Sequence, residues 1–143
     1  MANRLFVRRR DGRIEVRLND AGRGIAREAF AHVLAAEADP EHEWHASLNA
    51  PIDPSHDLDD PLATFNRQHE ITSNVELAIA TLGEEFLNDA EAWAWLCTLQ
   101  VALRATITAK GLMSEDRLAA ADDATRDYIT TLQTFLFGLA DVM

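Results

Sequence analysis

The sequence predicts a mainly α-helical protein, a bundle of about four helices with an N-terminal β-hairpin. Apolar residues recur at helical spacing in four segments, which cover about residues 20–38, 61–82, 89–110 and 115–139. Residues that favour helix starts precede these segments. Two strand-like runs near the N-terminus surround an Asp-Gly dipeptide, which is typical of a hairpin turn. Short connections between the last three helices predict antiparallel neighbours.

Length and composition predict a single domain that spans residues 1–143. A chain of 143 residues with 48% hydrophobic and 26% charged residues has the composition of a globular protein. One ordinary hydrophobic core is enough at this size. We therefore expect the whole chain to fold as one unit.

The hairpin is expected over residues 4–18, with Asp11-Gly12 as a two-residue type I′ turn. Side chains alternate between the two faces of a strand, so the turn also predicts which face is buried. The face expected to lie on the core pairs Leu5 with Leu18, Val7 with Val16 and Arg9 with Ile14. The face expected in solvent carries Phe6, Arg8, Arg10, Arg13, Glu15 and Arg17.

Helix boundaries follow from capping residues. Asn19 or Asp20 is expected to cap the first helix, Asp60-Pro61 to open the second and Asn88 to open the third. Ser114 is expected to open the last helical segment, which is predicted to be a single helix. The acidic stretch between the first two helices, residues 39–60, is aperiodic and predicts a long connection with a helical turn at about 41–48.

The third helix is apolar around most of its circumference, which predicts a central and buried helix. Gln100 and Arg104 are polar residues within it, on the face that carries Trp93 and Cys97. A buried guanidinium needs a partner, so we expect a structural salt bridge or a backbone acceptor from a neighbouring helix. The alternative is a small anion pocket at Arg104.

Charge is divided unevenly along the chain. Residues 1–27 carry eight arginines and three acidic residues, whereas residues 28–143 carry five basic and 21 acidic residues. The N-terminal segment therefore has a formal charge of +5, the remainder −16, and the whole chain −11. The basic hairpin either docks on the protein's own acidic body or holds an anionic partner.

A candidate partner-binding surface combines the outer hairpin face with an apolar residue of the last helix. Phe137 and Met143 fall outside the apolar stripe of that helix, and exposed apolar residues can mark a partner or dimer surface. The candidate partner-binding residues are Phe6, Arg8, Arg10, Arg13, Arg17 and Phe137. The acidic body discourages nucleic-acid binding, so we expect no nucleic-acid partner.

No catalytic motif is present, and we expect neither an enzyme nor a bound cofactor. The chain lacks a nucleophile elbow, a phosphate loop and a dinucleotide fingerprint. All five histidines lie between residues 32 and 69, where carboxylates are also frequent. Imidazole and carboxylate suit a transition metal, but their spacing matches no known metal site, so no metal ligand is assigned.

The cysteine count and the short apolar runs of the sequence predict a cytoplasmic protein. Cys97 is the only cysteine, which rules out an intramolecular disulfide and suits a reducing compartment. The short apolar run before Arg8 is too brief for a secretory signal. No stretch of 18 consecutive apolar residues occurs, so we expect no membrane segment.

Three motifs carry a family resemblance that spans nearly the full chain: the run at 74–82 (NVELAIATL), the run at 92–99 (AWAWLCTL) and Ser114-Glu115-Asp116. With these motifs the chain resembles an uncharacterised actinobacterial family of unknown function, whose genes often neighbour the gene for the ClpS adaptor. The family has an Asn and then an Arg after the Trp-Leu pair, where Gln100 and Arg104 stand here. The resemblance implies a link to Clp-type proteolysis. It implies no catalytic residues, because none are established for the family.

The leading functional hypothesis is a non-enzymatic protein-interaction or regulatory module, with a protein partner or a second copy of the chain. The alternative is a binder of a metal ion or small anion through the His-rich and acidic connection or Arg104. Nucleic-acid binding by the arginine hairpin is a third idea, which the net charge of −11 disfavours.

Overall fold

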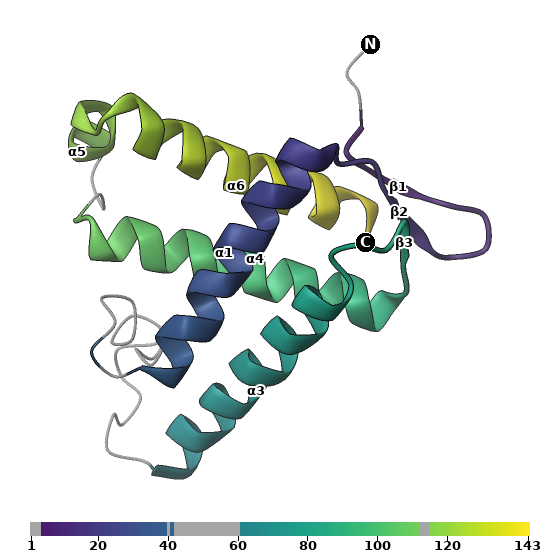
Figure 1. Ribbon diagram of the computed structural model, residues 1–143, viewed down its shortest axis with the longest axis horizontal. Helices are drawn as coiled ribbons and strands as arrows, with labels where there is room; N and C mark the ends of the chain where they lie inside the picture. Colours follow the sequence, from purple (N-terminus) through teal and green to yellow (C-terminus); the bar gives the residue numbers. More distant parts are fainter. Residues whose placement is uncertain (1–3, 40, 42–60, 112–114) are drawn as a thin grey trace.

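Figure 1 shows the computed structural model, which describes residues 4–39, 41, 61–111 and 115–143, without the side chains of 61–68 and 115. The helices are α1 (Asp20–Ala38), α3 (Pro61–Ala80), α4 (Asp89–Ala109), α5 (Glu115–Ala120) and α6 (Asp123–Val142). The strands are β1 (Phe6–Arg8), β2 (Ile14–Val16) and β3 (Phe86–Leu87). The prediction of a mainly helical protein with about four major helices and an N-terminal hairpin is confirmed.

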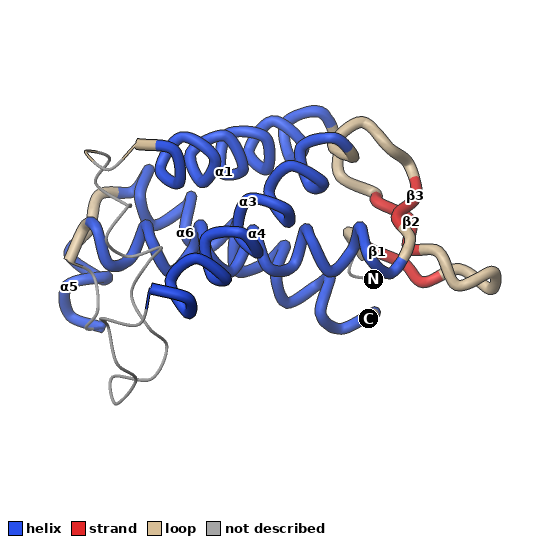
Figure 2. The backbone as a smooth tube through the Cα atoms, turned by 90° about the horizontal axis from the view of Figure 1, so that it is seen from below, coloured by secondary structure: helices blue, strands red, loops and turns tan. Residues whose placement is uncertain are grey.

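The small sheet lies at one end of the molecule and α5 at the other (Figure 2). The helix α4 packs against α1, α3 and α6, and α6 also packs against β1. The chain end of α6 thus lies at the same end of the molecule as the hairpin (Figure 1).

Capping explains where the helices begin. The side chain of Asn19 accepts a hydrogen bond from the Gly22 amide at 2.8 Å, which opens α1. Asn88 opens α4 with a full capping box, in which its side chain and that of Glu91 each accept a backbone N–H at 2.8 Å. The boundaries expected for α1, α3 and α4 agree with the structure to within two residues.

The expectation of one helix over 115–139 is wrong, because α5 ends at Ala120 and α6 begins at Asp123. Asp122 caps α6 by accepting the Thr125 amide at 2.7 Å. The hydrogen bonds from Thr125 lower the pKa of the Asp122 carboxyl. The apolar stripe continues across this break, so periodicity alone did not reveal it. Ser114, the expected cap, lies outside the described residues.

The sheet has three antiparallel strands in the order β1-β2-β3, whereas the sequence predicted two. In β3, Leu87 pairs with Ile14 and Phe86 pairs with Glu15. The Val16 amide also donates to the Glu85 carbonyl at 2.8 Å. A third strand matters because an isolated two-stranded hairpin is marginal in water.

The expected hairpin register is wrong by one residue on β1. The observed pairs are Phe6 with Val16, Val7 with Glu15 and Arg8 with Ile14. The Gly12 amide donates to the Arg9 carbonyl at 3.0 Å, and Gly12 has φ +90°. The loop is therefore a three-residue turn with one left-handed glycine.

This slip turns every side chain of β1 to the opposite face. Phe6, expected in solvent, is only 1% exposed, whereas Val7, expected in the core, is half-buried. On β2 the expectation was right, since Ile14 and Val16 are buried. The extra loop residue is the reason that one strand was assigned correctly and the other was not.

Trp95 of α4 lies at the centre of the core and is fully buried. Its indole packs edge to face on Phe6, at 6.3 Å between ring centroids, and on Phe30, at 5.3 Å. The indole N–H donates to the Thr81 hydroxyl at 2.8 Å. One side chain therefore joins the hairpin, α1, α4 and the end of α3.

A half-buried arginine, Arg23 of α1, supports the same region. Its guanidinium donates to the carbonyls of Leu82 at 2.6 Å, Glu84 at 3.1 Å and Val16 at 3.2 Å. These bonds satisfy backbone acceptors in the chain between α3 and β3 and in β2. Arg23 thus ties α1 to the sheet, a role that the sequence analysis did not assign.

The turn expected at 41–48 and most of the connection at 39–60 lie outside the described residues.

Two alanine variants distinguish the observed register from the expected one. Phe6→Ala should lower the free energy of unfolding by about 3–5 kcal/mol, because it empties a buried aromatic site. Val7→Ala should cost less than about 1 kcal/mol, because Val7 is only half-buried. Urea denaturation followed by circular dichroism measures both values. A larger loss for Val7→Ala than for Phe6→Ala would contradict the observed register.

Candidate partner-binding surface

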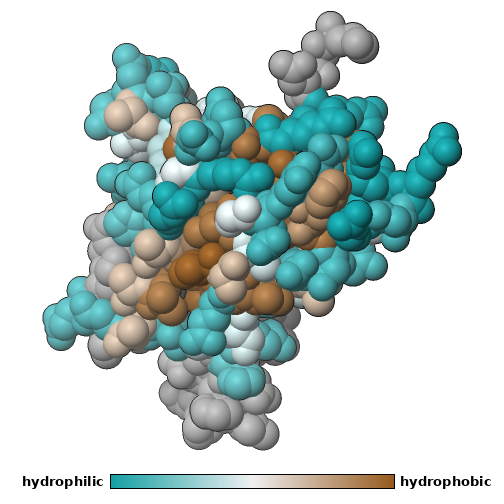
Figure 3. Space-filling view, turned by 45° about the vertical axis from the view of Figure 1, so that its right-hand side comes forward, coloured by the Kyte–Doolittle hydropathy of each residue, from teal (hydrophilic) through white to brown (hydrophobic). Residues whose placement is uncertain are grey.

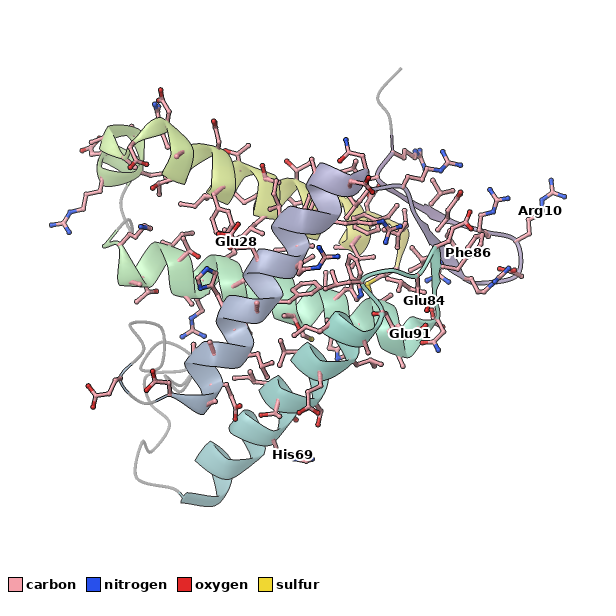
Figure 4. The ribbon with its side chains drawn as sticks, viewed as in Figure 1. Arg10, Glu28, His69, Glu84, Phe86 and Glu91 are labelled. Carbon is pink, nitrogen blue, oxygen red and sulfur yellow. The ribbon has the colours of Figure 1, made fainter. Side chains whose placement is uncertain are left out.

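The hairpin loop projects from the body of the protein, and Arg10 lies near its far end (Figure 4). In the space-filling view, the projecting loop is hydrophilic (Figure 3). We call the residues around this loop the hairpin basic surface: Arg8, Arg9, Arg10, Asp11, Arg13 and Phe86. They line an open hollow of about 450 Å³.

The loop geometry is held by Asp11. Its carboxylate accepts the Arg13 amide at 2.9 Å and the Arg13 Nε at 2.8 Å. The side-chain hydrogen bond from Arg13 is the main reason that the pKa of Asp11 is lowered. The guanidinium of Arg13 also stacks over the ring of Phe86, at 4.3 Å from the ring centroid. Arg13 is therefore oriented by two neighbours.

Three further arginines of the hairpin are paired with the protein itself. Arg8 donates to the Val142 carbonyl at 2.7 Å and lies 3.4 Å from the Asp89 carboxylate. Arg9 and Arg17 both reach the carboxylate of Glu15, at 3.4 Å and 3.1 Å. Of these three arginines, only Arg8 pairs with a residue of the acidic body, Asp89. Arg9 and Arg17 instead pair with Glu15, an acidic residue of the hairpin itself. The expected docking of the basic segment on the acidic body therefore accounts for one of the three contacts.

Arg10 differs from its neighbours, because it forms no ion pair or side-chain hydrogen bond within the part of the chain that the structure describes. Residues 8–17 carry five arginines and two acidic residues, so their formal charge is +3. The surface thus keeps uncompensated positive charge on a body that is otherwise strongly acidic.

The other predicted partner-binding residues lie elsewhere. Phe6 does not belong to any surface, because it is buried against Trp95. Arg17 lines a second hollow of about 360 Å³, together with Arg4 and Phe135. Phe137 of α6 is 65% exposed, so its predicted exposure is confirmed.

Gln100 and Arg104 are not the buried polar pair that the sequence predicted, since both are exposed. The helices α1, α3 and α6 pack around α4 but leave one side of it uncovered. Trp93, on the same side, is 56% exposed. Arg104 lines none of the three hollows described here, which leaves the anion-pocket alternative without a supporting contact.

A third hollow of about 360 Å³ lies where α1, α4 and α6 meet. Glu28, His32, Lys110 and Tyr128 are among its lining residues. The Tyr128 hydroxyl is buried and has no hydrogen-bond partner among the described residues. Burial, with a smaller effect from Glu28, raises the pKa of Tyr128 to about 12.

The described residues contain no group of three or more His, Cys, Asp or Glu side chains able to hold a metal ion. Most of the His-rich connection lies outside that part of the chain. Among the described helices, none is both long and apolar enough to cross a membrane.

Sequence reasoning missed three residues of the hairpin basic surface, Arg9, Asp11 and Phe86. Arg9 was assigned to the core face because of the assumed two-residue turn. Phe86-Leu87, between the end of α3 and the Asn88 cap, is a short apolar pair that a search for brief strands could have found.

Comparison with known proteins adds no assignment: no family model, no curated protein and no solved structure matches the chain.

Tyr128 predicts a pH dependence at high pH. Because its pKa in the folded state is about 12, above the ordinary value of 10.0, the unfolded chain loses this proton first and the free energy of unfolding should fall as pH rises between these values. Tyr128 is the only tyrosine, so tyrosinate absorbance reports it directly.

We expect an absorbance titration near pH 12 for the folded protein and near pH 10 in denaturant. Tyr128→Phe should remove this part of the pH dependence of stability. Identical titrations in the folded and denatured states would contradict the burial of this hydroxyl.

Proposed function

We propose that this protein is a non-enzymatic interaction module that binds an acidic segment of a partner protein through the hairpin basic surface. The observation that carries the proposal is Arg10, an arginine without a partner among the described residues, beside a hollow lined by three further arginines. Carboxylates in an extended peptide are natural ligands for guanidinium groups arranged around an open hollow.

The charge of the remaining chain narrows the class of partner. Residues 28–143 carry a formal charge of −16, so a large polyanion such as duplex nucleic acid is repelled by most of the surface. A short acidic segment can approach the projecting hairpin without covering the acidic body. Attraction to the basic hairpin and repulsion from the acidic remainder of the protein together favour a short acidic peptide over nucleic acid as the ligand.

Phe86 and Arg13 add specificity to this surface. The stacking of Arg13 on Phe86 holds one guanidinium in a fixed orientation. Its Nε and Nη2 groups meet Asp11, and the side chain remains 53% exposed. A preorganised arginine loses less conformational entropy on binding than a free one. The rigid Arg13 and the unpaired Arg10 therefore serve different parts of the same ligand.

The resemblance to the actinobacterial family implies that the partner acts in Clp-type regulated proteolysis, and we propose this as the first class of partner to test. The described residues add no contact that favours the alternative, which is a metal ion at the His-rich and acidic connection or a small anion at the exposed Arg104.

A labelled oligoglutamate peptide tests the chemistry of the surface. The double variant Arg9→Ser/Arg10→Ser should bind it about 2- to 30-fold more weakly than wild type by fluorescence anisotropy, since each exposed ion pair contributes about 0.2–1 kcal/mol. Added salt should reduce wild-type binding. The matched control is Arg27→Ser/Arg126→Ser, which removes the same charge from α1 and α6.

The same variants test the partner by crosslinked pulldown from the native cytoplasm. A specific partner should be lost with Arg9→Ser/Arg10→Ser and kept with Arg27→Ser/Arg126→Ser. Equal recovery by both variants would contradict a role for the hairpin basic surface.

A further inference from the structure

One acidic residue, Asp11, lies among the arginines of the hairpin basic surface. Its Oδ2 atom accepts a hydrogen bond from Nε of Arg13 at 2.8 Å and lies 2.8 Å from Nη2 of the same side chain. Its Oδ1 atom accepts the Arg13 amide at 2.9 Å. The Asp11 carboxylate therefore occupies the edge of the guanidinium that Nε and Nη2 form.

An acidic ligand would use the same edge of Arg13. A guanidinium binds a carboxylate most strongly through two parallel N–H groups. Of the five N–H donors of Arg13, the one on Nε and one on Nη2 face Asp11, which leaves three on the terminal nitrogens. One face of the guanidinium is stacked on Phe86, so a ligand cannot approach from that side. In the free protein, Asp11 thus stands where a carboxylate of the ligand would bind.

Arg9 and Arg10 are not held at such close range. Arg10 forms no ion pair or side-chain hydrogen bond within the described part of the chain. Arg9 lies 3.4 Å from the carboxylate of Glu15, which is longer than the usual distance of a charge-assisted hydrogen bond. These two guanidiniums can therefore meet a ligand without first releasing a close internal partner.

We propose that Asp11 is a built-in competitor of the acidic ligand: its carboxylate occupies Arg13 in the free protein, and a carboxylate of the bound segment replaces it. This role rests on the proposed function, because it regulates the same surface. The side chains of Asp11 and Arg13 are 51% and 53% exposed, so the exchange opens no part of the core.

The competitor makes the surface selective for segments with several acidic residues. Asp11 is two residues from Arg13, so its carboxylate acts at an effective concentration on the order of millimolar. Exchange of one carboxylate for another at Arg13 adds no ion pair. A single carboxylate therefore gains little at this position, whereas a segment with further carboxylates also pairs with Arg9 and Arg10. Competition at one arginine thus rejects the weaker class of ligand.

The loop keeps its shape during the exchange. The bond from the Arg13 amide to Oδ1 of Asp11 spans two residues, as in an Asx-turn, and does not involve the guanidinium. An asparagine at position 11 can keep this bond through its side-chain oxygen, but it lacks the negative charge that holds Nε and Nη2. The variant Asp11→Asn therefore removes the competitor and preserves the turn.

Fluorescence anisotropy with labelled oligoglutamate tests the competitor in about 0.15 M salt. Asp11→Asn should bind the peptide about 1.5- to 5-fold more tightly than wild type, the ratio that corresponds to one exposed ion pair. The matched control is Asp123→Asn, which removes the same charge from an ion pair with Arg126. Asp123 begins α6 at the end of the molecule away from the sheet (Figure 1). Since charges are screened over about 8 Å in this salt, the control should bind as wild type does.

Arg13→Lys separates release of the guanidinium edge from a simple loss of negative charge. Lysine keeps the positive charge but cannot bind a carboxylate through a planar pair of N–H groups. The gain from Asp11→Asn should therefore be smaller in an Arg13→Lys background than with Arg13 in place. Both positions are exposed, so neither change disturbs the core. An equal gain in the two backgrounds would overturn the proposal, because charge alone would then explain it.

The outcomes distinguish this role from the proposed function. If wild type binds oligoglutamate and Asp11→Asn binds it no more tightly, the competitor is refuted and the binding of an acidic segment stands. If neither protein binds the peptide, the proposed function fails, and the role of Asp11 fails with it.

Discussion

The structure depends on the burial of one indole, that of Trp95. An indole ring in a fully buried site needs close apolar neighbours and an acceptor for its N–H group. Phe6 and Phe30 supply the neighbours, and the Thr81 hydroxyl supplies the acceptor at 2.8 Å. Since these groups come from β1, α1 and the end of α3, satisfying Trp95 brings together elements that are distant in the sequence. A short hairpin that would be marginal alone is thereby fixed to a helical body.

This anchor determines which surfaces of the protein are exposed. With Phe6 held on Trp95, and with Arg8 bonded to the Val142 carbonyl, the base of the hairpin has a fixed position on α4 and α6. The loop beyond it extends into solvent and presents Arg10. The same packing buries Trp95 and Leu99 of α4 and, among the described residues, leaves Trp93 and Arg104 exposed. The position of the projecting loop and the exposure of these α4 residues are therefore both consequences of how α4 is buried.

Local sequence patterns predicted the local structure of the chain. Capping residues such as Asn19 and Asn88 marked helix starts, and periodicity identified the four major helices. The hairpin register failed because Asp-Gly suits more than one turn, and a loop longer by one residue turned Phe6 inward. Apolar residues all around α4 suggested full burial, but hydropathy does not reveal how many neighbours a helix has, so Arg104 was misplaced. Arg23 bonds to carbonyls about 60 residues away in sequence, a pairing that no local pattern carries.

The coupling between Phe6 and Trp95 tests most directly whether the hairpin is anchored by this aromatic contact. A double-mutant cycle with Phe6→Leu, Trp95→Leu and the combined variant, measured by urea denaturation, isolates the pairwise energy, because the loss of the Thr81 bond is common to both variants at position 95. The account predicts a coupling energy of about 0.5–1.5 kcal/mol, the range for aromatic pairs in contact. Strictly additive losses, with a coupling energy of zero within error, would contradict it.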